Sequence, residues 1–381
     1  MLEASGREEQ QHNLFQQSIS HFHRFSINMH LSQLWQLALL GLAGLSIAHP
    51  GAHEESSLTP AAKKAFLHNA KRSLGQCADR LERRGVNARA AARRAAITET
   101  YRKRSLLNSR DTDRVVNTSH HSPLQVTSNT PETELFSNNP VCILAPEGEI
   151  GPFWVKGELV RSDISDGESG IPLIMDGQFV DIETCEPIQN LYWDVWSCNS
   201  TGQYSGVQSD MNGNGNDASN LDKTFLRGIQ QTDSDGVAQF KSIFPGHYDG
   251  RATHVHVVAH VGSHTLKNNT IAGGHVSHIG QLFFDQDLIS KVEATYPYNT
   301  NNVSITQNAD DHVVQDETED SNSDPIFEYA LLGDKLQDGV LAWVTMGINV
   351  SATYDTSNAA TLTSSGGVMN DDSSPGGTVN M

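Results

Sequence analysis

Between residues 140 and 351, short runs of β-branched and aromatic residues alternate with turns rich in glycine, asparagine and aspartate. Side chains on a strand point alternately to its two faces, so these runs predict strands with one face in a core. The predicted strands are Trp154–Val160, Asn190–Cys198, Val237–Lys241, Thr253–Val261, Gly280–Phe284 and Leu341–Val350. Short strands separated by turn signals predict an all-β domain with a β-sandwich core.

The pattern changes before this domain. Residues 57–110 are rich in alanine, leucine, arginine and lysine, which favour helices, and Gly85 predicts a break. Residues 57–115 contain 15 Lys and Arg, whereas the residues after 115 contain 9 Lys and Arg against 35 Asp and Glu. We therefore expect a basic helical arm that packs on an acidic domain. A basic helix also suits nucleic acid or an anionic membrane. For an exported chain we expect neither partner, and the arm is a candidate surface for a homodimer.

The N-terminal residues predict export. Residues 37–45 are apolar and end at Ser46-Ile47-Ala48, a small-residue cleavage pattern. We predict a signal peptide over residues 29–48, with Met29 as its natural start and residues 1–28 as a polar prefix from a mis-assigned start. Export to the extracellular space agrees with five candidate glycosylation sequons, which begin at Asn117, Asn199, Asn268, Asn302 and Asn349.

Four cysteines allow three disulfide pairings: Cys77, Cys142, Cys185 and Cys198. An even number in an exported chain favours disulfides, whereas a zinc site lacks the usual CxxC spacing. Cys185 and Cys198 flank one predicted strand, so we favour that pair.

The remaining segments are polar. Residues 49–139 are expected to hold the basic arm and a Ser/Thr-rich linker, residues 140–351 the sandwich, and residues 352–381 a disordered tail. Within the sandwich, residues 206–221 are rich in glycine and asparagine and predict a mobile loop. Residues 310–324 are acidic and predict a solvated loop.

The candidate chemistry lies in residues 244–256. His254 and His256 share one face of a predicted strand, because strand side chains alternate, while Thr253, Val255 and Val257 face the core. Tyr248 lies in the turn before this strand, and a second tyrosine, Tyr204, follows an earlier strand. Two phenolates and two imidazoles are suitable ligands for iron(III). Arg251 would lie beside such a site, which suits an aromatic diol.

Each of these features is a weak signal by itself. A His-x-His pair on a strand is more often structural, tyrosines at strand ends usually pack or face water, and an arginine near a turn is usually solvated. The combination of the four candidate ligands with Arg251 favours the metal site.

Six stretches make the chain resemble a known family. They are Cys142–Glu147 leading to Gly151–Val155, Gly157–Arg161 with Asp163-Ile164, Asp194–Asn199 running to Tyr204–Gly206, Phe225–Gly228 with Gln231–Asp233, Phe244–His256, and Gly280–Phe284. Over roughly residues 140–350 the chain resembles the intradiol ring-cleavage dioxygenases, the group of catechol and protocatechuate dioxygenases, most closely their secreted fungal-type branch. The short gap between Tyr248 and His254 and the pair Phe153-Trp154 depart from relatives.

The resemblance implies a sandwich fold, an Fe(3+) cofactor, and O2-dependent cleavage of a catechol-type diol between its hydroxyls to a muconate-type diacid. It implies that Tyr204 and His254 are equatorial ligands, that Tyr248 and His256 are axial, and that Tyr248 also takes a substrate proton. Arg251 would stabilise developing negative charge, Gln281 would hydrogen-bond in the same pocket, and Pro152 would line it.

Two alternatives remain open. A copper/zinc superoxide-dismutase-like sandwich would use His254 and His256 with other histidines among His260, His264, His275 and His278, but it leaves both tyrosines and Arg251 unexplained. A secreted binding module without catalysis would not need the complete set of four ligands. Colour and metal content distinguish these alternatives from an iron enzyme.

Overall fold

The computed structural model describes residues 77–105, 141–142, 150–318 and 324–370. The predicted polar prefix, the signal peptide, the linker and the candidate glycosylation site Asn117 lie outside these residues. In the part of the chain that the structure describes, no helix is long and apolar enough to cross a membrane.

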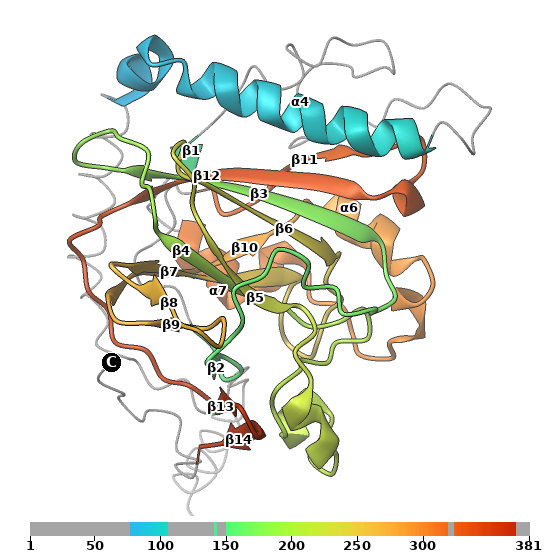
Figure 1. Cartoon of the computed structure of the whole chain (residues 1–381). Coiled ribbons are helices and arrows are strands. Elements are labelled where there is room, and N and C mark those ends of the chain that lie inside the picture. The colour runs from blue at the N-terminus through green and yellow to red at the C-terminus, as the bar shows by residue number, and fades with distance from the viewer. Residues whose placement is uncertain (1–76, 106–140, 143–149, 319–323, 371–381) are drawn as a thin grey trace, which may run out of the picture. The chain divides into compact units, whose positions relative to one another are not determined.

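Two β-sheets form the centre of the domain (Figure 1). The first has the strand order β1-β12-β3-β6, with β11 also paired to β12, and β12 runs parallel to both β1 and β3. The second has the order β10-β7-β4-β5, and all its strands are antiparallel. The strands of the two sheets are β1 (Val141–Cys142), β3 (Pro172–Asp181), β4 (Tyr192–Trp196), β5 (Arg227–Gln231), β6 (Val237–Ile243), β7 (His254–Val261), β10 (His275–Phe283), β11 (Glu328–Leu331) and β12 (Val340–Ile348).

The main core lies between these sheets. Trp193 of β4 and Val255 and Val257 of β7 pack in one cluster with Phe179 of β3 and Phe240 of β6. The Trp193 ring contacts the rings of Phe179 and Phe240 with centroids 5.6 and 5.2 Å apart. Because successive side chains of a strand point to opposite faces, the face of each sheet that is turned away from this core can pack against other elements. The predicted β-sandwich is confirmed.

Smaller elements surround the sandwich. Two short sheets and two helices are formed by β2 (Val155–Lys156), β13 (Ala360–Thr363), β14 (Gly366–Met369), β8 (His264–Thr265), β9 (Ile271–Ala272), α6 (Gln286–Glu293) and α7 (His312–Thr318). The 3-10 turns are η1 (Asp210–Asn212), η2 (Ala218–Asp222), η3 (Tyr298–Thr300), η4 (Asn308–Asp310) and η5 (Leu336–Asp338).

The predicted disordered tail is wrong for residues 360–369. These residues form the β13–β14 hairpin, and β13 pairs with β2. The polar composition hid this hairpin because its strands are only partly buried, so hydrophobic alternation is weak. Residues 371–381 lie outside the described part of the chain.

The basic arm covers the outer face of the first sheet. Residues 77–83 are helical, Gly85 interrupts the helix with a φ of 65°, and α4 (Val86–Ser105) follows. Ala91 and Ala95 of α4 pack against Trp343 and Leu341 of β12. Figure 1 shows α4 lying along β12 and β3. The expected helical arm with a break at Gly85 is confirmed for the described residues.

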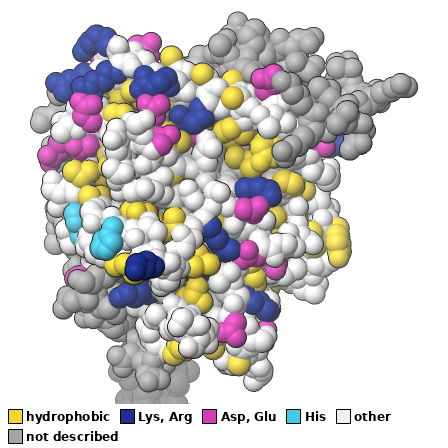
Figure 2. All heavy atoms as spheres, viewed as in Figure 1, with side chains coloured by type: hydrophobic (Ala, Val, Ile, Leu, Met, Phe, Trp, Pro, Cys, Tyr) yellow, Lys and Arg dark blue, Asp and Glu magenta, His cyan; other side chains and the backbone are white. Residues whose placement is uncertain are grey.

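Ion pairs reinforce this packing. Asp176 of β3 accepts hydrogen bonds from Arg93 Nε (2.8 Å), Arg93 Nη2 (2.9 Å) and Arg94 Nε (3.0 Å). Arg89, in the first turn of α4, pairs with Asp235 at 2.8 Å. Figure 2 shows basic side chains gathered over the arm with acidic side chains beside them. The predicted attraction between arm and domain therefore takes the form of specific pairs.

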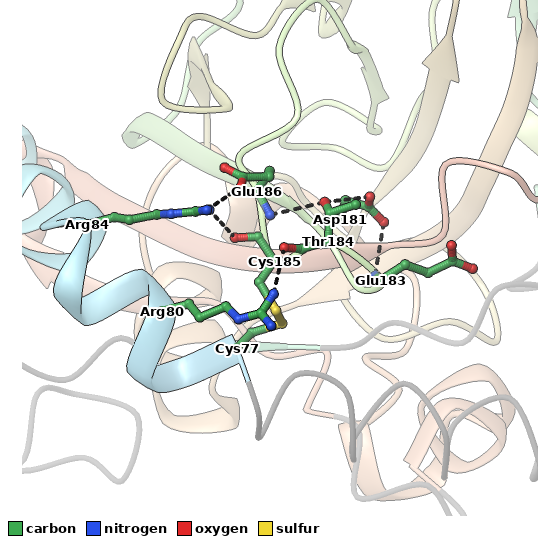
Figure 3. Close-up of a disulfide and its surroundings, with 8 residues drawn as sticks. All are labelled: Cys77, Arg80, Arg84, Asp181, Glu183, Thr184, Cys185 and Glu186. Carbon is green, nitrogen blue, oxygen red and sulfur yellow. Dashed lines mark hydrogen bonds and ion pairs between the residues drawn. A yellow bond between two sulfur atoms is a disulfide. The ribbon is translucent and has the colours of Figure 1, made fainter.

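A disulfide joins the first described residue of the arm to the domain. Cys77 is bonded to Cys185, with Cα atoms 5.1 Å apart (Figure 3). Arg84 Nη1 donates to the Cys185 carbonyl at 3.3 Å and also pairs with Glu186. The predicted Cys185–Cys198 pair is wrong. β4 separates these two residues, and Cys198 is a buried thiol directed at the Gly246 carbonyl at 3.3 Å.

Candidate metal centre

Strand β7 presents both candidate histidines on the face opposite the main core. Its register places Val255 and Val257 in the core, so His254 and His256 project from the outer face. His254 Nδ1 lies 2.6 Å from the Ala252 carbonyl, to which it must donate a proton. This contact fixes the tautomer and leaves a lone pair on His254 Nε2, the form that binds a metal.

The His256 ring is held by its neighbours. It stacks on Trp196, its partner in the register of β4 and β7, with centroids 4.7 Å apart and planes 3° from parallel. Gly151 lies on the same ring, so close that a Cβ there would be 2.8 Å from His256 Cε1. A glycine with a φ of 74° is therefore required at this contact. The candidate pocket residue Pro152 follows directly and is half-buried.

Two loops bring the tyrosines to this face. The turn after β4 packs on the segment before Tyr248, where Gly246 N donates to the Asn199 carbonyl at 3.2 Å. Gly202 lies so near the His247 carbonyl that a Cβ would be 2.3 Å from its oxygen. The rings of Tyr204 and Tyr248 then meet edge to face with centroids 5.5 Å apart. Along the chain these tyrosines lie 50 and 6 residues from His254.

The side-chain donors of this cluster converge. His254 Nε2 is 3.4 Å from the Tyr204 hydroxyl, 3.3 Å from the Tyr248 hydroxyl and 3.1 Å from His256 Nε2. Two donors that each lie about 2 Å from one first-row metal ion, at roughly right to tetrahedral angles, are separated by roughly 2.9–3.4 Å. The predicted ligands Tyr204, Tyr248, His254 and His256 therefore fit one ion. Among the described residues no group of three or more His, Cys, Asp or Glu could hold a metal, and the candidate set consists of two histidines and two phenols.

Both phenols are neutral in the absence of a cation. Burial raises the pKa of Tyr204 well above 10, and the neighbouring Tyr248 and Cys198 raise it further. Burial likewise raises the pKa of Tyr248, with a partial offset from Arg251. Without added positive charge both phenols stay protonated at neutral pH. A bound metal ion would supply that charge and displace the protons.

Arg251 is fully buried beside the histidines. Its Nε donates to Asp311 Oδ2 at 2.8 Å, and its Nη2 donates to Gln281 Oε1 at 2.6 Å. The structure thus brings Arg251 and Gln281 together, as the resemblance implied. Glu317 Oε1 accepts the Gln281 backbone N–H at 3.2 Å.

Sequence reasoning missed Asp311 because residues 310–324 read as a solvated acidic loop. Instead, Asp311 is fully buried and precedes α7. Its carboxylate accepts N–H bonds from Ala252 (2.7 Å), Val313 (2.9 Å) and Val314 (3.0 Å), in addition to Arg251. The signal that could have found it is the Asp-x-Val-Val pattern of an N-cap before an apolar helical turn, here Asp311-His312-Val313-Val314.

A second polar cluster lies behind Tyr204. The guanidinium of Arg227 lies 5.9 Å from the centre of the Tyr204 ring, and it pairs with Glu158 at 3.7 Å. Burial raises the pKa of Glu158 to about 8, with Arg227 opposing and Asp194 adding to the effect. Asp194 accepts from Trp154 Nε1 at 3.0 Å. These residues stand in the stretches that carry the resemblance, but the sequence alone assigned them no role.

The aromatic departure from relatives lies at the cluster itself. The Phe153 ring is 4.9 Å from the Tyr204 ring and 6.3 Å from the Tyr248 ring, measured between centroids. Phe153 therefore forms an apolar wall over both phenols.

One candidate glycosylation site must be withdrawn. Asn199 is buried, its Nδ2 donates to Glu168 at 3.1 Å, and its Oδ1 accepts from Thr201 and Gln203. The side chain builds the turn before Tyr204 and cannot carry a glycan there. Asn268 and Asn302 are exposed and Asn349 is half-buried, so they stay candidates.

Comparison with known proteins decides the family. Residues 153–326 match a protein-family model described as "Dioxygenase". This range begins at Phe153 and includes all four candidate ligands together with Arg251 and Gln281. Residues 153–326 therefore form a dioxygenase domain, and the chain is an oxidoreductase. This agrees with the resemblance to the intradiol ring-cleavage dioxygenases, which implied cleavage of a catechol-type ring.

Several solved structures are similar to this dioxygenase domain. An intradiol ring-cleavage dioxygenase from Tetranychus urticae is 29% identical over 56% of this chain and 97% of its own, with a TM-score of 0.46. Catechol 1,2-dioxygenase from Pseudomonas arvilla C-1 is 17% identical over 53% of this chain and 61% of its own, with a TM-score of 0.35. Hydroxyquinol 1,2-dioxygenase from Pseudomonas putida DLL-E4 is 17% identical over 52% of this chain and 64% of its own, with a TM-score of 0.32. No curated protein matches the chain.

Proposed function

We propose that this chain is an exported iron(III) dioxygenase. It would cleave a small catechol-type diol between its two hydroxyls and incorporate both atoms of O2, giving a muconate-type diacid. The observation that carries the proposal is the convergence of two tyrosine hydroxyls and His256 Nε2 on His254 Nε2, at 3.1–3.4 Å. Hard phenolate oxygens favour the ferric ion over softer metals.

Bound by Tyr204, Tyr248, His254 and His256, iron(III) would supply the charge that keeps both phenols ionised and would activate the diol ring toward O2. The chain supports this chemistry by holding neutral imidazoles in place. His254 is oriented by the Ala252 carbonyl and His256 by the Trp196 ring. Phe153 and the core around it limit water at the site.

Tyr248 is suited to move a proton. It is 9% exposed, whereas Tyr204 is completely buried, so an entering diol reaches the Tyr248 side of the cluster more readily. Chelation of a catechol requires loss of both hydroxyl protons. We assign one of these protons to the Tyr248 phenolate oxygen, which accepts it as the diol enters.

Arg251 supplies fixed positive charge. Asp311 and Gln281 hold its guanidinium on two sides, so the charge needs no reorganisation when negative charge develops on the diol. Pro152 follows the glycine that contacts His256, which supports its assignment to the pocket wall.

Export is supported by the predicted signal peptide and by the Cys77–Cys185 disulfide, because disulfides persist in oxidising compartments. The expected partners are the diol and O2, without nucleic acid or membrane. A homodimer through the basic arm has less support, because part of that basic face already pairs with Asp176 and Asp235.

Neither alternative function is favoured. A copper/zinc site needs further histidines beside His254 and His256, but His260 bonds to Asp194 at 3.3 Å, and His275 bonds to the Val350 carbonyl at 3.0 Å. A binding module would not require convergent phenols whose ionisation is costly without a metal.

Metal content, colour and product test the proposal together. The purified, iron-replete protein should hold about one iron per chain and absorb visible light through tyrosinate-to-iron(III) charge transfer. Oxygen uptake against catechols, hydroxyquinols and protocatechuate would identify the substrate, and catechol should give a colourless muconic acid. Tyr204→Phe and Tyr248→Phe should alter the band and abolish most turnover. A yellow semialdehyde product, or a colourless protein without iron, would contradict the proposal.

A further inference from the structure

The glycine- and asparagine-rich segment after Tyr204 is folded around that tyrosine. Sequence analysis predicted a mobile loop over residues 206–221, but the segment forms η1 and η2. Three of its asparagines are almost completely buried although their side chains are polar. They are Asn212, Asn214 and Asn220, with 3%, 6% and 1% exposure. Buried amides of this kind require hydrogen-bond partners.

Asn212 pairs with the backbone of Tyr204 as a neighbouring strand would. Its Oδ1 accepts the Tyr204 N–H at 2.7 Å, and its Nδ2 donates to the Tyr204 carbonyl at 2.8 Å. Only this orientation of the amide satisfies both backbone groups. Tyr204 lies outside every strand, so no sheet ladder supplies these partners. Asn212 replaces the missing ladder at the position that carries a candidate ligand.

Asn220, in η2, also hydrogen-bonds to the Tyr204 backbone. We call the hydrogen bonds from Asn212 and Asn220 to this backbone the clasp. Asn220 Nδ2 donates to the Tyr204 carbonyl at 2.8 Å and to the Val207 carbonyl at 2.7 Å. Its own carbonyl accepts the Gly206 N–H at 2.9 Å. The Tyr204 carbonyl therefore receives two side-chain donors, and the chain from Tyr204 to Val207 is fixed on one side by η2.

Asn214 has the same chemistry but a different target. Its Nδ2 donates to the Val207 carbonyl at 2.8 Å, and its Oδ1 accepts the Ser209 N–H at 3.0 Å. It stabilises the loop without touching Tyr204. The loop thus contains a natural control, because one buried asparagine holds the candidate ligand and another of equal type holds only its neighbours.

We propose that Asn212, assisted by Asn220, is a positioning residue for the Tyr204 phenolate. Fixing φ and ψ at residue 204 fixes the direction in which the side chain leaves the backbone toward His254 Nε2. A loss of this clasp lets the hydroxyl drift within the cluster, and small misplacements at a reacting centre are costly to turnover. The inference rests on the proposed iron function, since it concerns how one of the proposed ligands is aimed.

Isosteric variants of the full-length, iron-loaded enzyme test the inference. Asn212→Asp keeps the acceptor for the Tyr204 N–H but turns the donor into a second acceptor that faces the Tyr204 carbonyl. Asn214→Asp makes the same change opposite Val207. We expect Asn212→Asp to shift or weaken the visible charge-transfer band and to lower kcat about 10²-fold. In its iron-free form, the backbone amides of residues 199–208 should exchange with deuterium faster than in wild type.

Asn214→Asp should lose a similar amount of thermal stability but keep the band, and its kcat should stay within about twofold of wild type. Equal spectral shifts in both variants, or none in Asn212→Asp, would overturn the inference. If Asn212→Asp does not fold, Asn220→Ala should show a smaller shift in the same direction, and an unshifted band there is equally decisive. A wild type without iron or colour would instead overturn the proposed function, which separates the two failures.

Discussion

Two buried arginine–aspartate pairs lie on opposite sides of the sandwich. Arg94 of α4 pairs with Asp176 of β3 at 3.0 Å, and Arg251 pairs with Asp311 at 2.8 Å. All four side chains are completely buried. Taking such charges out of water is costly, so each pair persists only because further hydrogen bonds satisfy it. The two pairs differ in which groups donate those bonds to the carboxylate.

In the arm pair, the carboxylate is shared. Asp176 binds Arg93 as well as Arg94, and it also accepts from Gln239 Nε2 at 2.7 Å. The Arg94 guanidinium lies 5.5 Å from the centre of the Trp343 ring, which favours a cation. Each of these partners comes from the arm or from the first sheet. The pair therefore serves to hold the arm on the sandwich.

In the site pair, the backbone satisfies the carboxylate. Three N–H groups bind Asp311, so the carboxylate is held even without its arginine. The arginine can then be aimed, with Nη2 reaching Gln281 beside the cluster. A buried arginine–aspartate pair thus attaches the arm to the sandwich in one region and holds a positive charge in place beside the candidate metal centre in the other. Stability should depend on the first pair and turnover on the second.

The largest effect is expected for Asp176→Ala. It leaves Arg93 and Arg94 without their shared carboxylate in a buried position, which should cost about 3–5 kcal/mol in the free energy of unfolding. The visible band and kcat of the folded fraction should not change. Asp163→Ala is the control, because its pair with Lys241 is half-exposed and should be worth only about 0–1 kcal/mol. Urea unfolding of the three proteins measures the difference.

Arg251→Ala should have the opposite profile. The variant should retain iron and colour, because Asp311 keeps its three backbone donors, but lose turnover by roughly 10²–10³. Arg251→Lys should restore little, since an ammonium cannot reproduce the planar guanidinium. Arg94→Ala is the matched change in the arm and should lower stability while keeping kcat. An Arg251→Ala enzyme with wild-type turnover, or one unable to bind iron, would contradict the assigned role.

The part of the fold that the sequence predicts well consists of strands with a clear alternation of hydrophobic and polar residues. Strands β4, β6, β7 and β12 were predicted to within a few residues, because their core faces alternate clearly, and the His254/His256 face followed from the same period. The longest strand, β3, was missed, since both of its faces are buried and the outer one carries Asp176 and Gln178 under the arm. A polar residue at that position looks solvated until the arm is known to cover it.

The missed parts of the site have a common cause. Asp311, Asn212 and Asn220 are polar residues in segments of polar composition, so nothing local distinguishes them from solvated residues. Their hydrogen-bond partners are backbone groups that only folding brings near. The Tyr204 carbonyl, which accepts from Asn220 Nδ2, is an example. The Cys77–Cys185 bond likewise joins residues 108 apart in the sequence, a proximity that spacing cannot indicate.

Asp311→Asn should have a smaller effect than loss of Arg251. The carboxamide keeps an acceptor for the backbone but removes the charge that aims the guanidinium, and losses of such supporting partners typically cost about 10–100-fold in activity. The loss should appear in kcat more than in KM, with the visible band unchanged. Asp310→Asn, the exposed neighbour, should behave as wild type. Equal kinetics in the two variants would show that Asp311 only caps α7.

The smallest expected effect is a loss of stability at acidic pH. Burial would raise the pKa of Asp176, but the hydrogen bond from Arg93 and the charge of Arg94 outweigh it and hold the pKa below its usual value. A folded pKa below the unfolded value of about 3.9 means that the pairing stabilises fully above that pH. Its contribution is lost as the pH falls through the folded pKa. The difference in the free energy of unfolding between wild type and Asp176→Asn should therefore be constant from about pH 7 to 5 and should shrink below about pH 4. Urea unfolding at a series of pH values measures this difference. A gap that stays constant down to pH 3 would mean that hydrogen bonding and packing, rather than the charge of Asp176, hold the arm to the sandwich.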